Sequence, residues 1–209
     1  MLDSLLDYSR DNEAVFNLKH IKALLMDLFI AGTQTTSNTI TWTMTELLLN
    51  PDMLSRVRQE VNQTVKENGK TEEAKIIDLP YLDAVIKEAM RLHLAVPLLA
   101  PHKTETQVKL GNFYLTRKHT NHCKRMGDGT RPKILGTTDG VCARKILEKR
   151  GCPGMPLAHR MVHLIAATLV HHFDWELPYA REEMDMNDIF GITLLRRTPL
   201  VATPLGRKC

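Results

Sequence analysis

The chain has 209 residues, of which 43% are hydrophobic, and it carries a formal net charge of +4. This length allows one buried core and indicates a single domain or less. Basic residues are mostly scattered without interleaved aromatic side chains, and no signal peptide or run of about 18 apolar residues is present, so we expect neither nucleic-acid binding nor a membrane span.

The first predicted element is a long helix over residues 18–49, where apolar residues recur at helical spacing until Asn50-Pro51 stops the run. Within it lies the run AGTQTT at residues 31–36, which consists largely of poor helix formers. Small residues leave room beside the backbone, and threonine hydroxyls can bond back to carbonyls and open the helix locally. Plain helix packing of small residues is the alternative interpretation.

Two further helices follow. The second spans residues 52–67, with Leu54, Val57, Val61 and Val65 on one face, and a charged connector follows it up to Lys75. The third is predicted near residues 80–94, before Pro97, and carries Glu88 and Arg91. These two residues are three apart, so they lie on one face and can pair. Such a pair alone is common on solvated helix surfaces and contributes little to stability.

Short β-structure and a fourth helix complete the predicted elements. Residues 108–110 and 113–115 flank Gly111-Asn112, which predicts a hairpin with a two-residue turn. Residues 117–150 are rich in Lys and Arg, show no clear period and predict an irregular segment. A helix is predicted over residues 156–172, and short strands at residues 192–195 and 200–202.

Cys152 stands directly before the fourth helix, in the run RGCPGMPLA at residues 150–158. Unpaired backbone N–H groups and the helix dipole at a helix N-terminus favour the thiolate form of a cysteine. Gly154 lets the chain pass close to a flat partner, and Pro156 suits the first helical turn. A thiolate held in this way can be an axial ligand to haem iron, whereas a buried structural cysteine is the alternative.

Taken together and in this order, the three motifs resemble the C-terminal half of a cytochrome P-450, a haem-thiolate monooxygenase. The resemblance covers residues 1–117 and 150–209. It is closest to the plant terpenoid hydroxylases that include geraniol 8-hydroxylase, through the runs LPYL at 79–82, KEAMRLH at 87–93 and PHK at 101–103, with Asp185-Met186 and Phe190-Gly191 later. The implied fold is mainly α with small β-hairpins, an incomplete C-terminal half of the P-450 fold.

The resemblance also implies a role for each motif. Cys152 is the proximal iron ligand, with Arg150 and Gly154 beside it at the cofactor, and Thr35 helps deliver protons during oxygen activation. Glu88 and Arg91 belong to a buried charge network that braces the haem side of the fold. Gln34 departs from the family pattern, which has a carboxylate there, because an amide cannot relay a proton as an acid.

From the same resemblance follow a haem cofactor, a small lipophilic substrate such as a monoterpenoid, and electrons from an NADPH-cytochrome reductase. Full-length members of the family lie at the endoplasmic reticulum membrane, and the anchor is expected to be absent from this chain. We expect three regions. They are an oxygen-side and Glu-x-x-Arg region at 1–117, an irregular segment at 118–150 and the cysteine-bearing region at 151–209. Candidate pocket walls are residues 30–35, 95–99 and 190–192.

The irregular segment resembles nothing in the family as written. Codons can be chosen for residues 121–149 such that moving the reading frame forward by one nucleotide gives IIVNVWAMGRDPRYWEQPTEFVPERFLK, which resembles the family at this location and contains its P-E-R-F element. We therefore interpret the segment as the product of a frameshift or gene-model error. The arginine of P-E-R-F normally completes the network of Glu88 and Arg91.

Two alternatives remain open at the level of sequence. The chain can be a catalytically inactive truncated product, or a helical piece that serves only as an interaction module, because half of the haem pocket is missing and apolar helix faces are left exposed. A zinc site made of His119, His122 and Cys123, with Cys142 and Cys152 later in the chain, is disfavoured, because the spacing of these ligands fits no compact pair of chelating loops.

Overall fold

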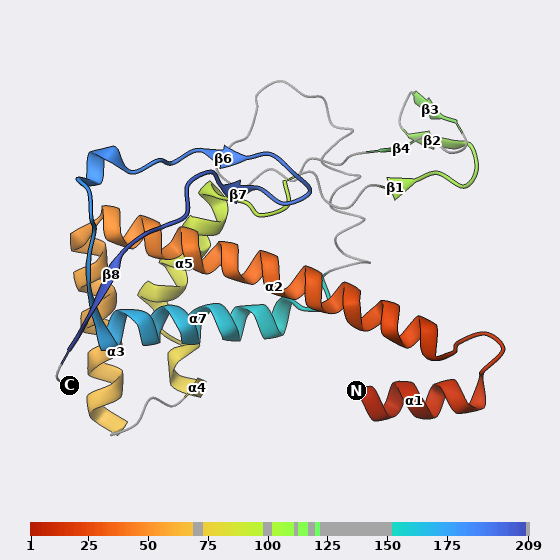
Figure 1. Ribbon diagram of the computed structural model, residues 1–209, viewed down its shortest axis with the longest axis horizontal. Coiled ribbons are helices and arrows are strands. Elements are labelled where there is room, and N and C mark those ends of the chain that lie inside the picture. Colours follow the sequence, from red (N-terminus) through yellow and green to blue (C-terminus); the bar gives the residue numbers. More distant parts are fainter. Residues whose placement is uncertain (69–72, 98–101, 111–112, 117–119, 122–151, 208–209) are drawn as a thin grey trace.

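The computed structural model describes residues 1–68, 73–97, 102–110, 113–116, 120–121 and 152–207 (Figure 1). Helices make up most of the described chain, and the strands form short antiparallel pairs, as the sequence predicts. The helices are α1 (Leu2–Asp11), α2 (Leu18–Leu49), α3 (Pro51–Asn68), α4 (Glu73–Ile76), α5 (Pro80–Leu92) and α7 (Met155–His172), with the short 3-10 helix η1 (Arg181–Glu183) near the end.

All four predicted helices are confirmed to within two residues at each end. The start of α2 is fixed by Asn17, whose side chain accepts a hydrogen bond from the Lys19 N–H and whose own N–H donates to Nδ1 of His20. Such capping satisfies backbone groups that the first helical turn leaves unpaired. Sequence analysis did not predict α1 or α4. Helix α4 lies in the charged connector, where Ile76 is buried in the core.

The predicted hairpin is confirmed as β2 (Val108–Leu110) and β3 (Phe113–Leu115), in which Val108 lies opposite Leu115. Strand β1 (His102–Lys103) pairs with β4 (Thr120–Asn121), β5 (Phe173–Glu176) with β8 (Thr203–Gly206), and β6 (Asp188–Ile189) with β7 (Leu195–Arg196). The strand predicted at residues 192–195 overlaps β7 only at Leu195, and the strand predicted at 200–202 is wrong, because β8 begins at Thr203. The predicted irregular segment at 118–150 lies outside the described residues, except for β4.

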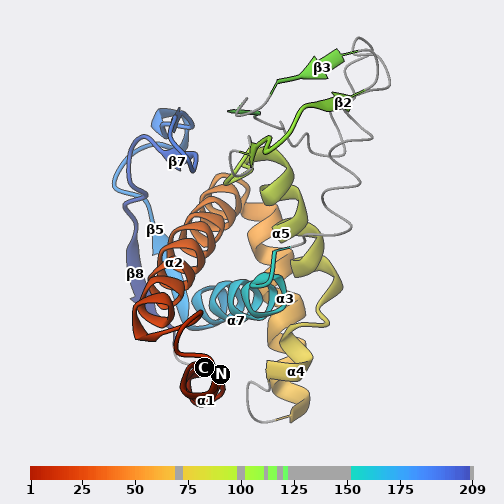
Figure 2. The same cartoon turned by 90° about the vertical axis from the view of Figure 1, so that its right-hand side faces the viewer.

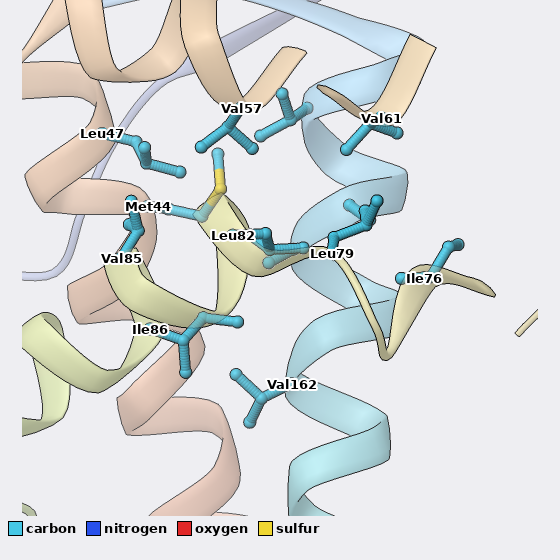
Figure 3. Close-up of a cluster of buried hydrophobic side chains, with 13 residues drawn as sticks. Met44, Leu47, Val57, Val61, Ile76, Leu79, Leu82, Val85, Ile86 and Val162 are labelled. Atoms are coloured by element: carbon cyan, nitrogen blue, oxygen red, sulfur yellow. The ribbon is translucent and has the colours of Figure 1, made fainter. Parts of the chain in front are cut away.

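The hydrophobic core lies where α2, α3, α5 and α7 meet (Figure 3). Val57 and Val61 of the predicted apolar face of α3 belong to it. Its other buried members are Met44, Leu47, Leu82, Val85, Ile86, Val162, Ala166, Ala167 and Val170, with Ile76 and Leu79 from the connection before α5. Figure 2 shows the C-terminal strands β5, β7 and β8 on one side of α2 and helices α3, α4 and α5 on the other. The two ends of α2 consequently differ. Its C-terminal part is buried, whereas residues 22–35 are exposed or half-buried.

Glu60 on α3 caps the N-terminus of α5. Its Oε1 accepts a hydrogen bond from the Tyr81 N–H at 2.8 Å, and its Oε2 accepts one from the Leu82 N–H at 2.9 Å. Both donors belong to the first turn of α5, where no backbone acceptor is in reach. We expect Glu60→Ala to lower the free energy of unfolding by about 1–2 kcal/mol in a denaturant titration, since it removes the cap of a helix packed in the core.

Glu60→Gln is the matched control, because it keeps one acceptor oxygen and loses the charge. We expect it to cost less than the alanine variant. An alanine variant as stable as the parent chain would show that water replaces this cap without loss.

Candidate functional site

The run at residues 31–36 lies in the exposed part of α2, which is helical without a break from Leu18 to Leu49. The Thr35 hydroxyl donates a hydrogen bond to the Ala31 carbonyl at 2.6 Å, as the sequence allows, but no local opening of the helix accompanies it. A Cβ atom added at Gly32 meets no atom within 4 Å, which confirms that the small residue leaves open space beside the helix. Gln34, which lies between Gly32 and Thr35 on α2, is exposed.

Cys152 precedes α7 as predicted, and its thiol is free and exposed. Its carbonyl accepts a hydrogen bond from the Met155 N–H at 3.2 Å, in the turn that leads into the helix. A Cβ atom added at Gly154 lies 3.8 Å from Sγ of Cys152, so this glycine sits directly beside the thiol. Pro156 falls in the first turn of α7, where its missing N–H costs nothing. Arg150 lies outside the described residues.

Glu88 and Arg91 form a bidentate ion pair on α5. The guanidinium Nε donates to Oε2 of Glu88 at 2.7 Å and Nη2 donates to Oε1 at 2.6 Å. The hydrogen bonds from Arg91 lower the pKa of the Glu88 carboxyl, and the same bonds raise the pKa of Arg91. The resemblance implies a buried network, which this structure does not show: the two side chains are 50% and 34% exposed, because no described element covers them.

The backbone of Leu194 connects α2 and the chain after α5 to the β6–β7 connection, and of these contacts only Ala95 belongs to a segment that the sequence assigns to a pocket. Its N–H donates to the Ala95 carbonyl at 2.8 Å, and its carbonyl accepts a hydrogen bond from Nδ2 of Asn38 at 2.9 Å. Helix α2, the chain after α5 and the β6–β7 connection with Phe190 are therefore held together. Leu98 and Leu99, the last part of the predicted wall, lie outside the described residues.

Asp185 fixes the base of the β6–β7 connection. Its carboxylate accepts hydrogen bonds from the Thr198 hydroxyl at 2.8 Å and from both the backbone N–H and the side-chain amide of Asn187. The hydrogen bond from Thr198 is the largest cause that lowers the pKa of Asp185 from 3.8 to about 2, followed by the side-chain and backbone hydrogen bonds from Asn187 and by the charge of Arg197.

Because the pKa of Asp185 is lower in the folded chain than in the unfolded one, its contribution to stability is present above pH 4 and is lost as the pH falls from about 4 towards 2. We expect Thr198→Val to raise the pKa of Asp185 in an NMR titration of its carboxyl, because the variant removes the largest cause of the shift. A pKa of about 2 retained in the variant would contradict this assignment.

Several apolar side chains on the elements that carry the motifs are exposed. Phe29 and Ile30 on α2, Leu157 on α7 and Phe190 on the β6–β7 connection are all well exposed. The free thiol of Cys152, with Gly154 beside it, is a donor of the kind that binds haem iron. Among the described residues, no hydrogen bond or ion pair links Thr35, Cys152 and the Glu88–Arg91 pair to one another.

An open groove of about 440 Å³ lies elsewhere, between α2 and the C-terminal strands. Ser37, Thr41 and Met44 line it on one side and Trp175 and Leu200 on another. Neither Thr35 nor Cys152 lines this groove, so it is separate from the residues that the motifs single out.

Two polar groupings in the structure are not predicted from the sequence. Trp42 stacks on His93 and lies under the guanidinium of Arg196, and His93 in turn contacts Glu46 at 2.7 Å. Asp83 on α5 faces His159 and His163 on α7. The spacing of His159 and His163, four apart on a predicted helix, is the one signal that the sequence offers for the second grouping.

Comparison with known proteins agrees with the motifs. The cytochrome P450 family model matches residues 1–122. The 11-hydroxysugiol 20-monooxygenase of Salvia miltiorrhiza is 39% identical over 98% of this chain and 44% of that protein. The carnosic acid synthase of Rosmarinus officinalis is 37% identical over 98% of this chain and 44% of its own length, and cytochrome P450 76T24 of Catharanthus roseus is 36% identical over 98% and 45%.

The chain belongs to the cytochrome P450 family. It spans less than half the length of the curated P450 relatives that it matches. Within the described part of this P450 chain, no helix has both the length and the apolar character required to cross a bilayer.

Proposed function

We propose that this P450 chain carries the thiolate ligand and the oxygen-side helix of a haem-dependent monooxygenase that acts on a small lipophilic substrate of the monoterpenoid class. The observation that carries the proposal is the free, exposed thiol of Cys152, which stands ahead of α7 with Gly154 beside it. A relative named as a monooxygenase, 39% identical over 98% of this chain, supports the reaction class.

The residues of the chain take distinct parts in this proposal. Cys152 binds the iron, Gly154 allows the flat group to approach, and Arg150 lies at the cofactor. When bound, haem supplies the redox-active iron that activates dioxygen. Thr35 holds a hydroxyl at the open face of α2 from which a proton can be passed, and Gln34 orients its neighbours by hydrogen bonds without acting as an acid.

The overall reaction consumes one dioxygen molecule, two protons and two electrons. An NADPH-cytochrome reductase supplies the electrons. One oxygen atom enters a C–H bond of the substrate as a hydroxyl group and the other leaves as water. Glu88 and Arg91 form a structural pair. It supports the haem side of the fold when the arginine of the P-E-R-F element completes their network.

A chimera tests the proposal. Residues 18–207 replace the matching part of the carnosic acid synthase, once as written and once with the reading frame restored over residues 121–149. We expect the restored chimera to show the absorption spectrum of thiolate-ligated haem, and Cys152→Ser to abolish it. A restored chimera whose spectrum is unchanged by Cys152→Ser would refute the role of Cys152.

A second candidate is an inactive product. It is favoured by the position at which the family match ends, residue 122, which falls where the inferred frameshift begins. The nucleotide sequence over codons 117–152 decides between the two. A one-nucleotide difference that restores the P-E-R-F element would mark the written chain as inactive, and an undisturbed frame in the transcript would refute the frameshift.

A further inference from the structure

Asp83, His159 and His163 bring three metal-ligand atoms together at the contact between α5 and α7. Oδ1 of Asp83 lies 3.5 Å from Nε2 of His159 and 3.4 Å from Nε2 of His163, and all three ligand atoms lie within 4.8 Å of one another. Two ligand atoms on a tetrahedral zinc ion, with bonds of about 2.0–2.2 Å, are about 3.3–3.6 Å apart. The two separations between Asp83 and the histidines thus match those of a metal site.

The contact that Nδ1 of His163 makes determines which ring nitrogen of this histidine carries the proton. Nδ1 of His163 lies 2.7 Å from the His159 carbonyl, which can only accept, so Nδ1 carries the proton. In a neutral ring Nε2 is then an acceptor, and it points at a carboxylate oxygen, which is an acceptor as well. His163 is fully buried, and its Nε2 has no hydrogen-bond partner among the described residues.

A metal cation bound by both Nε2 of His163 and Oδ1 of Asp83 would relieve the repulsion between these two acceptors. Metal-binding histidines commonly donate their second ring N–H to a backbone carbonyl, as His163 does. Lys87 holds Oδ2 of Asp83 at 2.5 Å and leaves Oδ1 for the histidines.

We propose that Asp83, His159 and His163 bind a divalent transition-metal ion of the zinc class, which clamps α5 to α7. Two imidazole nitrogens and one carboxylate oxygen form a ligand set that zinc accepts, with one position left for water. His159 is exposed and gives the ion a path from solvent, whereas His163 anchors it from the core. The site uses none of the residues proposed to hold haem.

Cobalt(II), which gives visible absorption bands in such sites, is the probe. The full 209-residue chain, with its cysteines alkylated to remove thiol ligands, is titrated with Co²⁺ and then with Zn²⁺. We expect one equivalent of Co²⁺ to bind, to be displaced by Zn²⁺ and to raise the melting temperature. Asp83→Asn and His159→Ala should each weaken binding at least tenfold and abolish the rise in melting temperature.

His172→Ala is the matched control, since it removes an exposed histidine from the same helix. It should leave the affinity for Co²⁺ unchanged. The proposal is overturned if the parent chain binds no Co²⁺, if Asp83→Asn and His159→Ala bind it as tightly as the parent chain, or if His172→Ala weakens binding as much as they do.

Discussion

When the 209-residue chain is mixed with haem, reduced and exposed to carbon monoxide, we expect no stable Soret band at the red-shifted position typical of thiolate ligation. Cys152 offers one axial bond, but its thiol is open to solvent. Phe29, Ile30 and Leu157, the apolar side chains near the motifs, are themselves exposed rather than arranged around an enclosed pocket. One axial bond does not hold a large apolar group whose faces remain in water.

The matched control is Cys152→Ser under the same conditions, which should give the same spectrum as the parent chain. A red-shifted band in the parent chain that disappears in the variant would show that these residues hold haem without further covering. That result would leave the proposed role of Cys152 intact and reject only the expected failure of the chain to bind alone.

Replacing Trp42 by alanine is expected to lower the free energy of unfolding by about 3–5 kcal/mol. The indole is 1% exposed and stacks on His93 with ring centroids 3.6 Å apart, while the guanidinium carbon of Arg196 lies over the indole, 5.2 Å from its ring centroid. Arg196 also donates to the Thr45 hydroxyl and the Asp185 carbonyl. Truncation therefore removes one large core side chain and both of its stacking contacts, from α2 to the end of α5 and to β7.

Denaturant unfolding followed by circular dichroism measures the effect. Because a domain is stable by only about 5–15 kcal/mol, the variant should lie near the limit of folding. Trp42→Phe keeps a stacked ring and should cost less, and Tyr114→Ala on exposed β3 should change stability by about 0.5 kcal/mol or less. A loss below about 1 kcal/mol in Trp42→Ala would contradict the assigned role of this stack.

Local signals account for the parts of the fold that the sequence predicted. Helices α2, α3, α5 and α7 carry periodic apolar faces and have proline or polar residues at their ends, so their positions follow from neighbours in the sequence. Strands β5 and β8 are held in register by residues some 30 positions apart, with Phe173 opposite Gly206, and no local pattern fixes such a pairing. Helix α4 is only four residues long and forms where Ile76 reaches the core.

In the candidate site, too, some features follow from local sequence and others depend on contacts between distant segments. The placement of Cys152 before a helix and the pairing of Glu88 with Arg91 follow from short spacings in the sequence. The exposure of that pair does not, because it depends on which elements pack over α5. Likewise, Asp83 meets His159 and His163 only because α5 lies against α7, and the contact of Leu194 with Ala95 and Asn38 joins segments far apart in the chain.

The unequal burial of α2 has a consequence for its dynamics. Amide protons around Trp42 and Leu47 are expected to exchange with solvent only when the whole core unfolds, because both side chains are fully packed. Amides from Lys22 to Thr35 are protected mainly by the hydrogen bonds of the helix itself, which open locally at low free energy. Gly32 and Thr35 thus lie on the fast-exchanging end of one continuous helix, and any molecule that covers this end must slow their exchange as it binds.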